Sequence, residues 1–342
     1  MSQDSMRVEQ AAVETAREPN QVLALLRTSV GRNLGLVIAL VVLCIVGLST
    51  AGDRFGSTDN ALTILKLAST IGVVSIGMTF VIIGGGIDLS VGAVAALSSI
   101  WCTTVATQTM AEDTHWIVMA VVALAVGSGC GLVNGLLISY GRIVPFIMTL
   151  AMLASARGLA QQISDRKTQI VKVDGFADFF NKEIIGIPVQ VWIFALVAVA
   201  GWILLNRTTF GRRTVAVGGN PEAARLAGIP VKRQTVYLYV LAGACAGLAA
   251  LMLVARTTTG SATHGNLWEL DAIAAVVIGG TLLTGGRGTI VGTVLGVLIF
   301  TTLQNVFILN NRSISEQELL RGVIIVAAVL LQQRLASRNS ST

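Results

Sequence analysis

The sequence predicts an all-α protein that crosses a membrane about ten times. Three observations support this: the composition is apolar, the apolar residues form long runs, and most basic residues lie between these runs. Of the 342 residues, 54% are hydrophobic and 12% are charged, whereas a soluble domain carries roughly 25% charged residues. The mean hydropathy is +0.76. This composition excludes an ordinary soluble domain, a disordered chain and a disulfide-rich secreted domain.

Ten apolar runs are candidates for membrane spans, because a helix needs about 20 predominantly apolar residues to cross the hydrocarbon core. The eighth run is short and is interrupted by glycines, so taken alone it also fits a re-entrant segment. In chain order the runs cover residues 33–51, 61–83, 87–107, 116–138, 143–163, 189–206, 235–255, 270–284, 288–309 and 319–335.

The distribution of charge favours ten crossings with both termini in the cytoplasm, since cytoplasmic loops carry an excess of Lys and Arg. If the eighth run did not cross, Arg334 and Arg338 would face outward. With ten crossings the acids gather outside, and the cytoplasmic side receives 14 of the 24 basic residues: Arg7, Arg17, Arg27, Arg32, Arg142, Arg207, Arg212, Arg213, Arg225, Lys232, Arg233, Arg287, Arg334 and Arg338.

The chain is expected to form one membrane domain, residues 33–335, between cytoplasmic tails at 1–32 and 336–342. Residues 1–32 are polar and mixed in charge, which does not fit a cleavable signal peptide. Two connections are long: 164–188 is expected outside and 207–234 in the cytoplasm. Neither is long enough to bury a core of its own.

The most distinctive local motif joins the second and third runs. Gly84, Gly85 and Gly86 break a helix at membrane depth or at its edge, where irregular backbone is tolerated only if it is buried in protein or lines a cavity. Asp88 and Ser90 then form a candidate N-cap pair for the next helix. A tight turn with a cap explains these residues, and so does an element of a translocation path or gate. A similar order of apolar run, glycine break and helix occurs in 81–94 and 276–294, which suggests an internal repeat.

No catalytic, metal-binding or ATP-binding element is apparent. None of the five lysines belongs to a GxxxxGK[ST] motif, so ATP would have to be hydrolysed by another subunit. Arg157, inside the fifth run, is interpreted as a helix–helix hydrogen-bond donor. The other charged residues, Asp88, Glu269 and Asp271, lie near the ends of apolar runs. Charges scattered in this way do not form the chain of ionisable groups that a proton relay needs. The two histidines, His115 and His264, and four cysteines inside apolar runs predict no metal site and no cofactor.

The cytoplasmic loop contains a short capped helix. The cap is Asn220, Pro221 fits the first helical position, Glu222 suits the positive end, and Gly228 fits the position after the last turn. The small apolar residues Ala223, Ala224, Leu226 and Ala227 are expected on one exposed surface. This surface suits a cytoplasmic protein partner better than it suits lipid headgroups.

Three segments resemble the permease subunits of ribose-type sugar ABC importers, within the wider branched-chain amino acid/ribose permease family: GGGIDLSVGAVAAL (84–97), VGGNPEAARLAGIPV (217–231) and LWELDAIAAVVIGGTLLTGGRGTIVGTVLGVLI (267–299). The resemblance implies a fold similar to the vitamin B12-type (type II) importer core. It also implies a bacterial plasma (inner) membrane location and a non-enzymatic subunit. The implied partners are a second permease subunit, two cytoplasmic ATPase subunits and an external sugar-binding protein.

The same resemblance identifies the loop helix as the coupling helix to the ATPase, with Glu222, Ala223, Ala224 and Gly228 matching its pattern and Asn220, Pro221 and Arg225 beside them. The expected cargo is a monosaccharide. Alternatives are a nucleoside, a polyol, an autoinducer or a branched-chain amino acid. A gradient-driven secondary transporter and a membrane-embedded enzyme are disfavoured by the absent relay and the absent acid clusters.

Overall fold

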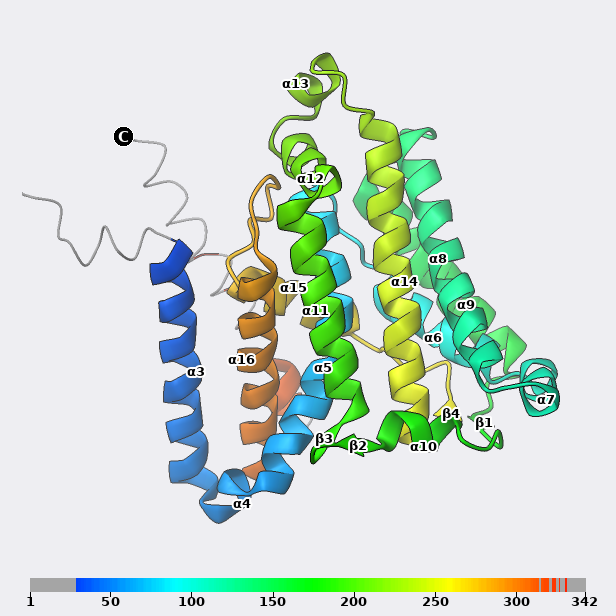
Figure 1. Ribbon diagram of the computed structural model, residues 1–342, viewed down its shortest axis with the longest axis vertical. Helices are drawn as coiled ribbons and strands as arrows, with labels where there is room; N and C mark the ends of the chain where they lie inside the picture. Colours follow the sequence, from blue (N-terminus) through cyan, green and yellow to red (C-terminus); the bar gives the residue numbers. More distant parts are fainter. Residues whose placement is uncertain (1–28, 314, 320–321, 324–325, 327–329, 331–342) are drawn as a thin grey trace, which may run out of the picture.

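A computed structural model describes residues 29–313, 315–319, 322–323, 326 and 330. Most of both predicted tails and most of the tenth run lie outside these residues. Seven helices of 19 residues or more form the body of the molecule, with their axes roughly along its long dimension (Figure 1). They are α3 (Ser29–Ala51), α5 (Thr58–Ile83), α8 (Ile117–Ser139), α9 (Pro145–Ile163), α11 (Val189–Arg207), α14 (Val231–Thr257) and α16 (Ile290–Leu309).

Six of these helices, all except α9, are long and apolar enough to cross a membrane. Two shorter helices, α6 (Val91–Cys102) and α7 (Val105–Asp113), form a seventh candidate that is bent by 56°. This confirms a helical protein with several membrane spans.

The prediction of about ten spans is not confirmed within the described residues. The eighth run forms α15 (Trp268–Ile278), which has 11 residues. At 1.5 Å per residue α15 is about 17 Å long, well short of a hydrocarbon core of about 30 Å. The glycines after Ile278 end this helix early.

The short elements gather at the two ends of the bundle (Figure 1). At one end, here called the α13 end, lie α12 (Thr209–Gly219) and α13 (Pro221–Leu226). The opposite end, here called the α10 end, carries α4 (Asp53–Gly56), α10 (Phe176–Asn181) and the strands β1 (Gln169–Ile170), β2 (Glu183–Ile184), β3 (Ile187–Pro188) and β4 (Thr259–Gly260). The antiparallel pairs are β1 with β4 and β2 with β3.

Burial separates inner helices from outer ones. In the most apolar part of α5, 89% of the residues are buried, and in α14 the share is 78%. The corresponding shares are 11% for α3 and 28% for α8 and α11, which leaves their Leu, Val and Ile side chains exposed, as lipid-facing helices require. Inside the bundle the amides of Asn60 and Asn305 bond reciprocally and join α5 to α16.

Candidate functional site at two helix breaks

The first break follows α5, as the three glycines predict. The helix ends at Ile83, and the N–H groups of Gly84, Gly85 and Gly86 donate to the carbonyls of Phe80, Ile82 and Val81. Gly85 has φ +83°, a left-handed conformation that glycine adopts without the steric cost other residues meet. The chain therefore turns sharply between α5 and α6.

A buried hydrogen-bond network follows the first break. Oδ1 of Asp88 accepts from the backbone N–H of Ser90 at 2.8 Å and from its hydroxyl at 2.6 Å. The Asn134 amide of α8 donates to the Ser90 hydroxyl at 3.0 Å. Asp88 therefore closes a turn just before α6. The expected N-cap pair is wrong: Asp88 accepts from Ser90, which precedes the helix, and the Ser90 side chain makes no capping bond to α6.

The second break follows α15 and repeats the geometry of the first. The N–H groups of Gly279, Gly280 and Thr281 donate to the carbonyls of Ala275, Val277 and Val276, the same offsets as after α5. Gly280 has φ +85°. The two segments suggested as an internal repeat thus share one helix-ending motif.

The first break, the end of α12 and the connection from the second break to α16 meet in a backbone contact that we call the glycine junction: Gly84–Gly86, Gly218–Gly219 and Gly285–Gly286. The Gly286 N–H donates to the Ile83 carbonyl at 2.8 Å. A Cβ added to Gly218 would overlap the Ile83 carbonyl oxygen and lie 2.8 Å from the Gly286 nitrogen. Gly218, Gly285 and Gly286 were not identified as functional from the sequence, although paired glycines at 218–219 and 285–286 were a signal for them.

The capped helix predicted in the long loop is α13. Oδ1 of Asn220 accepts from the Ala223 N–H at 2.9 Å, and Pro221 is the first helical residue. Glu222 and Arg225 form an exposed ion pair of 3.0 Å. Gly228, with φ +80°, follows the helix as expected.

The expected exposed surface of α13 needs one correction. Ala224 is only 4% exposed, whereas Leu226 is 80% exposed, and Ala223 and Ala227 are also exposed. Ala224 faces the protein because α13 folds back beside α12, and the Ile229 N–H returns to the Ala224 carbonyl. Leu226, rather than Ala224, is the principal apolar contact that α13 offers.

The ionisable groups in the bundle are less scattered than the sequence suggested. Arg157 does not bond to a neighbouring helix; its Nη1 donates to the backbone carbonyls of Ala262 and His264, in the connection between α14 and α15. Glu269 lies within electrostatic range of both Arg157 and Asp88. Across the described residues, no three His, Cys, Asp or Glu side chains are arranged to hold a metal ion.

Comparison with known proteins identifies the family of the chain. The family described as "Branched-chain amino acid transport system / permease component" matches residues 60–329. The chain belongs to this permease family. It is 41% identical over 305 residues to the ribose import permease protein RbsC of Bacillus subtilis, covering 89% of this chain and 93% of that protein.

Two further relatives agree. The ribose import permease protein RbsC of Escherichia coli K12 is 38% identical over 303 residues, covering 87% of this chain and 92% of that protein. The L-arabinose ABC transporter permease protein AraH of Azospirillum brasilense is 36% identical over 324 residues, covering 94% of this chain and 92% of that protein. No solved structure matches the chain. The protein is a multi-pass permease of the bacterial plasma (inner) membrane.

The structure gives the three segments that resemble this permease family a common location. Residues 84–97, 217–231 and 267–299 are far apart in the sequence, yet all three contribute to the glycine junction. In this permease the loop with α13 therefore contacts the first break and the connection between the second break and α16.

Proposed function

We propose that the chain is the channel-forming subunit of an ATP-binding-cassette importer that moves a monosaccharide into the cell. Its partners are a second permease subunit, two cytoplasmic ATPase subunits and an external sugar-binding protein. The proposal rests on extensive similarity to ribose and arabinose permeases. The relatives are permease proteins, which supports a subunit that is not an enzyme, and ATP hydrolysis is assigned to a partner because the sequence has no P-loop motif.

The single observation that supports a mechanism is the glycine junction. We place the α13 end in the cytoplasm, where α13 with its exposed Leu226 docks on an ATPase subunit. The Asn220 cap and the buried Ala224 hold α13 rigidly against α12, so that the two helices move together. Because Gly218 touches the backbone after α5 and before α16, movement of α12 displaces the first break and the connection to α16 without an intervening side chain.

In this arrangement α6 and α15 are half-length helices whose broken ends face the translocation path. Irregular backbone at membrane depth has to be enclosed in protein or line a cavity, and in many transporters such broken helices form the substrate site. Gly84, Gly85, Gly86, Asp88 and Ser90 belong to this path or its gate. With residues 319–335 as a final span, the segments number ten, as in the vitamin B12-type core.

Reconstitution tests the proposal. The permease is co-expressed with its ATPase and binding protein, and the purified complex is placed in proteoliposomes. We expect ATP-dependent uptake of radiolabelled D-ribose or L-arabinose that requires the binding protein. An ATPase variant that binds but does not hydrolyse ATP is the control and should abolish uptake. Uptake by the permease alone, driven by a proton or sodium gradient, would contradict the assignment.

A further inference from the structure

The connection between α14 and α15 enters the bundle from the α10 end. It begins beside β4 and rises to mid-height, where α15 starts (Figure 1). Along the way it packs against α6: the Ser99 hydroxyl donates to the Ser261 carbonyl at 3.2 Å, and Gly265 packs against Gly92 at the start of α6. Residues 261–267 therefore form a non-helical segment inside the bundle, which we call the re-entrant segment.

Arg157 holds the re-entrant segment in place. Its Nη1 donates to the Ala262 carbonyl at 2.5 Å and to the His264 carbonyl at 2.8 Å. The guanidinium carries five N–H donors, and these two bonds occupy one nitrogen.

Two acceptor atoms around the re-entrant segment are buried without a hydrogen-bond partner among the described residues: Nδ1 of His264 and Oε2 of Glu269. Arg157 and Glu269 attract each other, but the ion pairs of the described residues, all within 4.0 Å, do not include this pair. Buried polar atoms are normally satisfied. A hydrogen-bond donor that reaches Oε2 of Glu269 would satisfy this carboxylate oxygen.

The re-entrant segment also presents polar side chains outward. Thr263 and Asn266 are exposed, and Ala262 and Gly265 between them are buried. Exposed polar groups at this depth are unfavourable against lipid. Their surface therefore faces water or another protein surface.

We propose that Glu269, His264, Arg157 and Asn266 form a binding site for sugar hydroxyl groups in the α10-end half of the translocation path. This inference rests on the proposed import function and adds the residues that contact the cargo. A hydroxyl both donates and accepts, so one hydroxyl can donate to the Glu269 carboxylate while it accepts from Arg157. Adjacent hydroxyls of a neutral monosaccharide can reach His264 and Asn266. A cargo without such groups leaves the buried acceptors unpaired.

The first test compares Glu269→Gln with Glu183→Gln, a matched change at an exposed glutamate of the α10 end. Uptake of D-ribose and L-arabinose is measured in the reconstituted complex, together with ATP hydrolysis stimulated by the loaded binding protein. A hydrogen bond to a charged group contributes enough that Glu269→Gln should lower uptake about 10-fold or more. Stimulated hydrolysis should persist, since the coupling elements are unchanged.

Uptake by Glu269→Gln equal to that of Glu183→Gln would overturn the site and leave the import function standing. Failure of the unaltered complex to import either sugar would overturn both. If Glu269→Gln lowers uptake, hydrolysis and the melting temperature together, the carboxylate has a structural role. A second measurement then decides whether sugar binds at this site.

That measurement uses Asn266→Cys in a background whose four native cysteines are replaced. A membrane-impermeant thiol reagent, added outside, should label this cysteine in the complete complex, and sugar delivered by the binding protein should protect it at least severalfold. Asp174→Cys, at an exposed site of the α10 end, should be labelled with or without sugar. Absent labelling, or labelling that sugar does not change, would overturn the proposal.

Discussion

At the scale of single residues, the critical positions are those where backbones touch. Gly218 illustrates this, because its neighbours are the Ile83 carbonyl and the Gly286 nitrogen, which cannot move aside as a side chain would. A Cβ added to the adjacent Gly219, on the same helix, would meet no atom of the described residues within 4 Å. Two successive glycines therefore have different roles.

We expect Gly218→Ala to separate α12 from the first break and from the connection before α16. Overpacking of this kind costs about 1–3 kcal/mol, so the melting temperature and ATP-driven uptake should both fall. Gly219→Ala is the matched control and should be neutral or slightly stabilising, because Ala is favoured over Gly in a helix by about 1 kcal/mol. Equal behaviour of the two variants in thermal unfolding would show that the backbone contact is unimportant.

Ser90 offers a second test at this scale, because it links Asp88 to Asn134. Ser90→Ala removes the acceptor of the Asn134 amide and leaves a buried donor unpaired, at a cost of about 1–2 kcal/mol. Ser98→Ala is the control: Ser98 lies on the same helix, is fully buried, and its hydroxyl has no partner among the described residues. Thermal unfolding in detergent should separate the two variants, and a Ser98→Ala loss as large as that of Ser90→Ala would refute the network's contribution.

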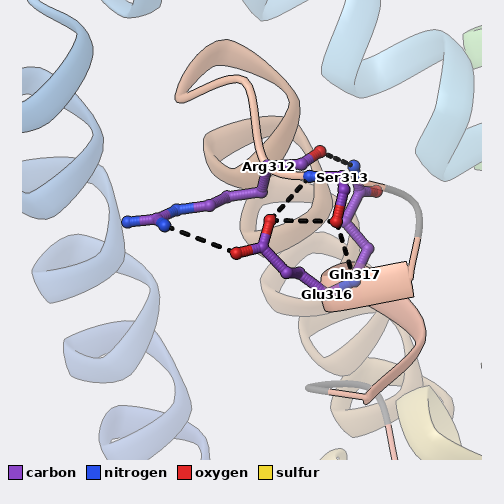
Figure 2. Close-up of polar contacts among 4 residues, drawn as sticks. All are labelled: Arg312, Ser313, Glu316 and Gln317. Carbon is purple, nitrogen blue, oxygen red and sulfur yellow. Dashed lines mark hydrogen bonds and ion pairs between the residues drawn. The ribbon is translucent and has the colours of Figure 1, made fainter.

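At the scale of elements, helix ends are fixed by local side chains. Figure 2 shows such an end after α16, where the Ser313 N–H and hydroxyl donate to Oε2 of Glu316 and the Glu316 N–H donates back to the Ser313 hydroxyl. This reciprocal arrangement is a capping box. Oε1 of Glu316 also approaches Arg312 at 3.6 Å. The box caps the helical residues 315–319.

The capping box should depend on pH. Hydrogen bonds from the Ser313 backbone and side chain hold the pKa of Glu316 below its usual value of 4.5. The stabilisation is therefore fully present above about pH 4.5 and is lost as the pH falls through the lower, folded-state pKa. Glu316→Gln should show faster amide exchange over residues 316–319 at pH 7, with the difference from the unaltered protein vanishing in acid. Glu318→Gln, outside the network of Figure 2, should change nothing at either pH.

The docking role of α13 is tested through Leu226. Burying a leucine contributes about 1.5–3 kcal/mol, so Leu226→Asp should weaken co-purification of the ATPase roughly 10- to 100-fold. Ile185→Asp is the control, since Ile185 is 89% exposed at the α10 end. A bulky residue at Ala224 would instead disturb the packing of α13 on α12. Normal ATPase recovery and normal uptake with Leu226→Asp would exclude α13 as the docking element.

At the scale of the whole molecule, the proposed function requires the α13 end to lie in the cytoplasm. Arg213 and Asp174 are exposed at opposite ends of the bundle. In a background without native cysteines, an impermeant thiol reagent added to intact cells should label Asp174→Cys, whereas Arg213→Cys should react only after permeabilisation. The opposite pattern would reverse the orientation and contradict the coupling proposal.

The sequence by itself determined the class of protein, the approximate positions of most spans, the ends of α13 and the break after α5. A membrane span is recognised from the mean hydropathy of consecutive residues. Caps such as Asn220 and breaks such as Gly84–Gly86 depend on three or four neighbouring residues, so the local sequence is enough to predict them. The family resemblance likewise rests on contiguous motifs.

Only the tertiary structure decided which residues meet. The contact of Gly218 with Ile83 and Gly286 joins segments that lie far apart in the chain, and no local pattern encodes it. The burial of Ala224 could not be predicted from the sequence, because a short helix of small residues has no clear apolar face. Arg157 was assigned the wrong partner because its carbonyl acceptors belong to a non-helical segment, whose position in the bundle depends on packing against α6 and not on its own composition.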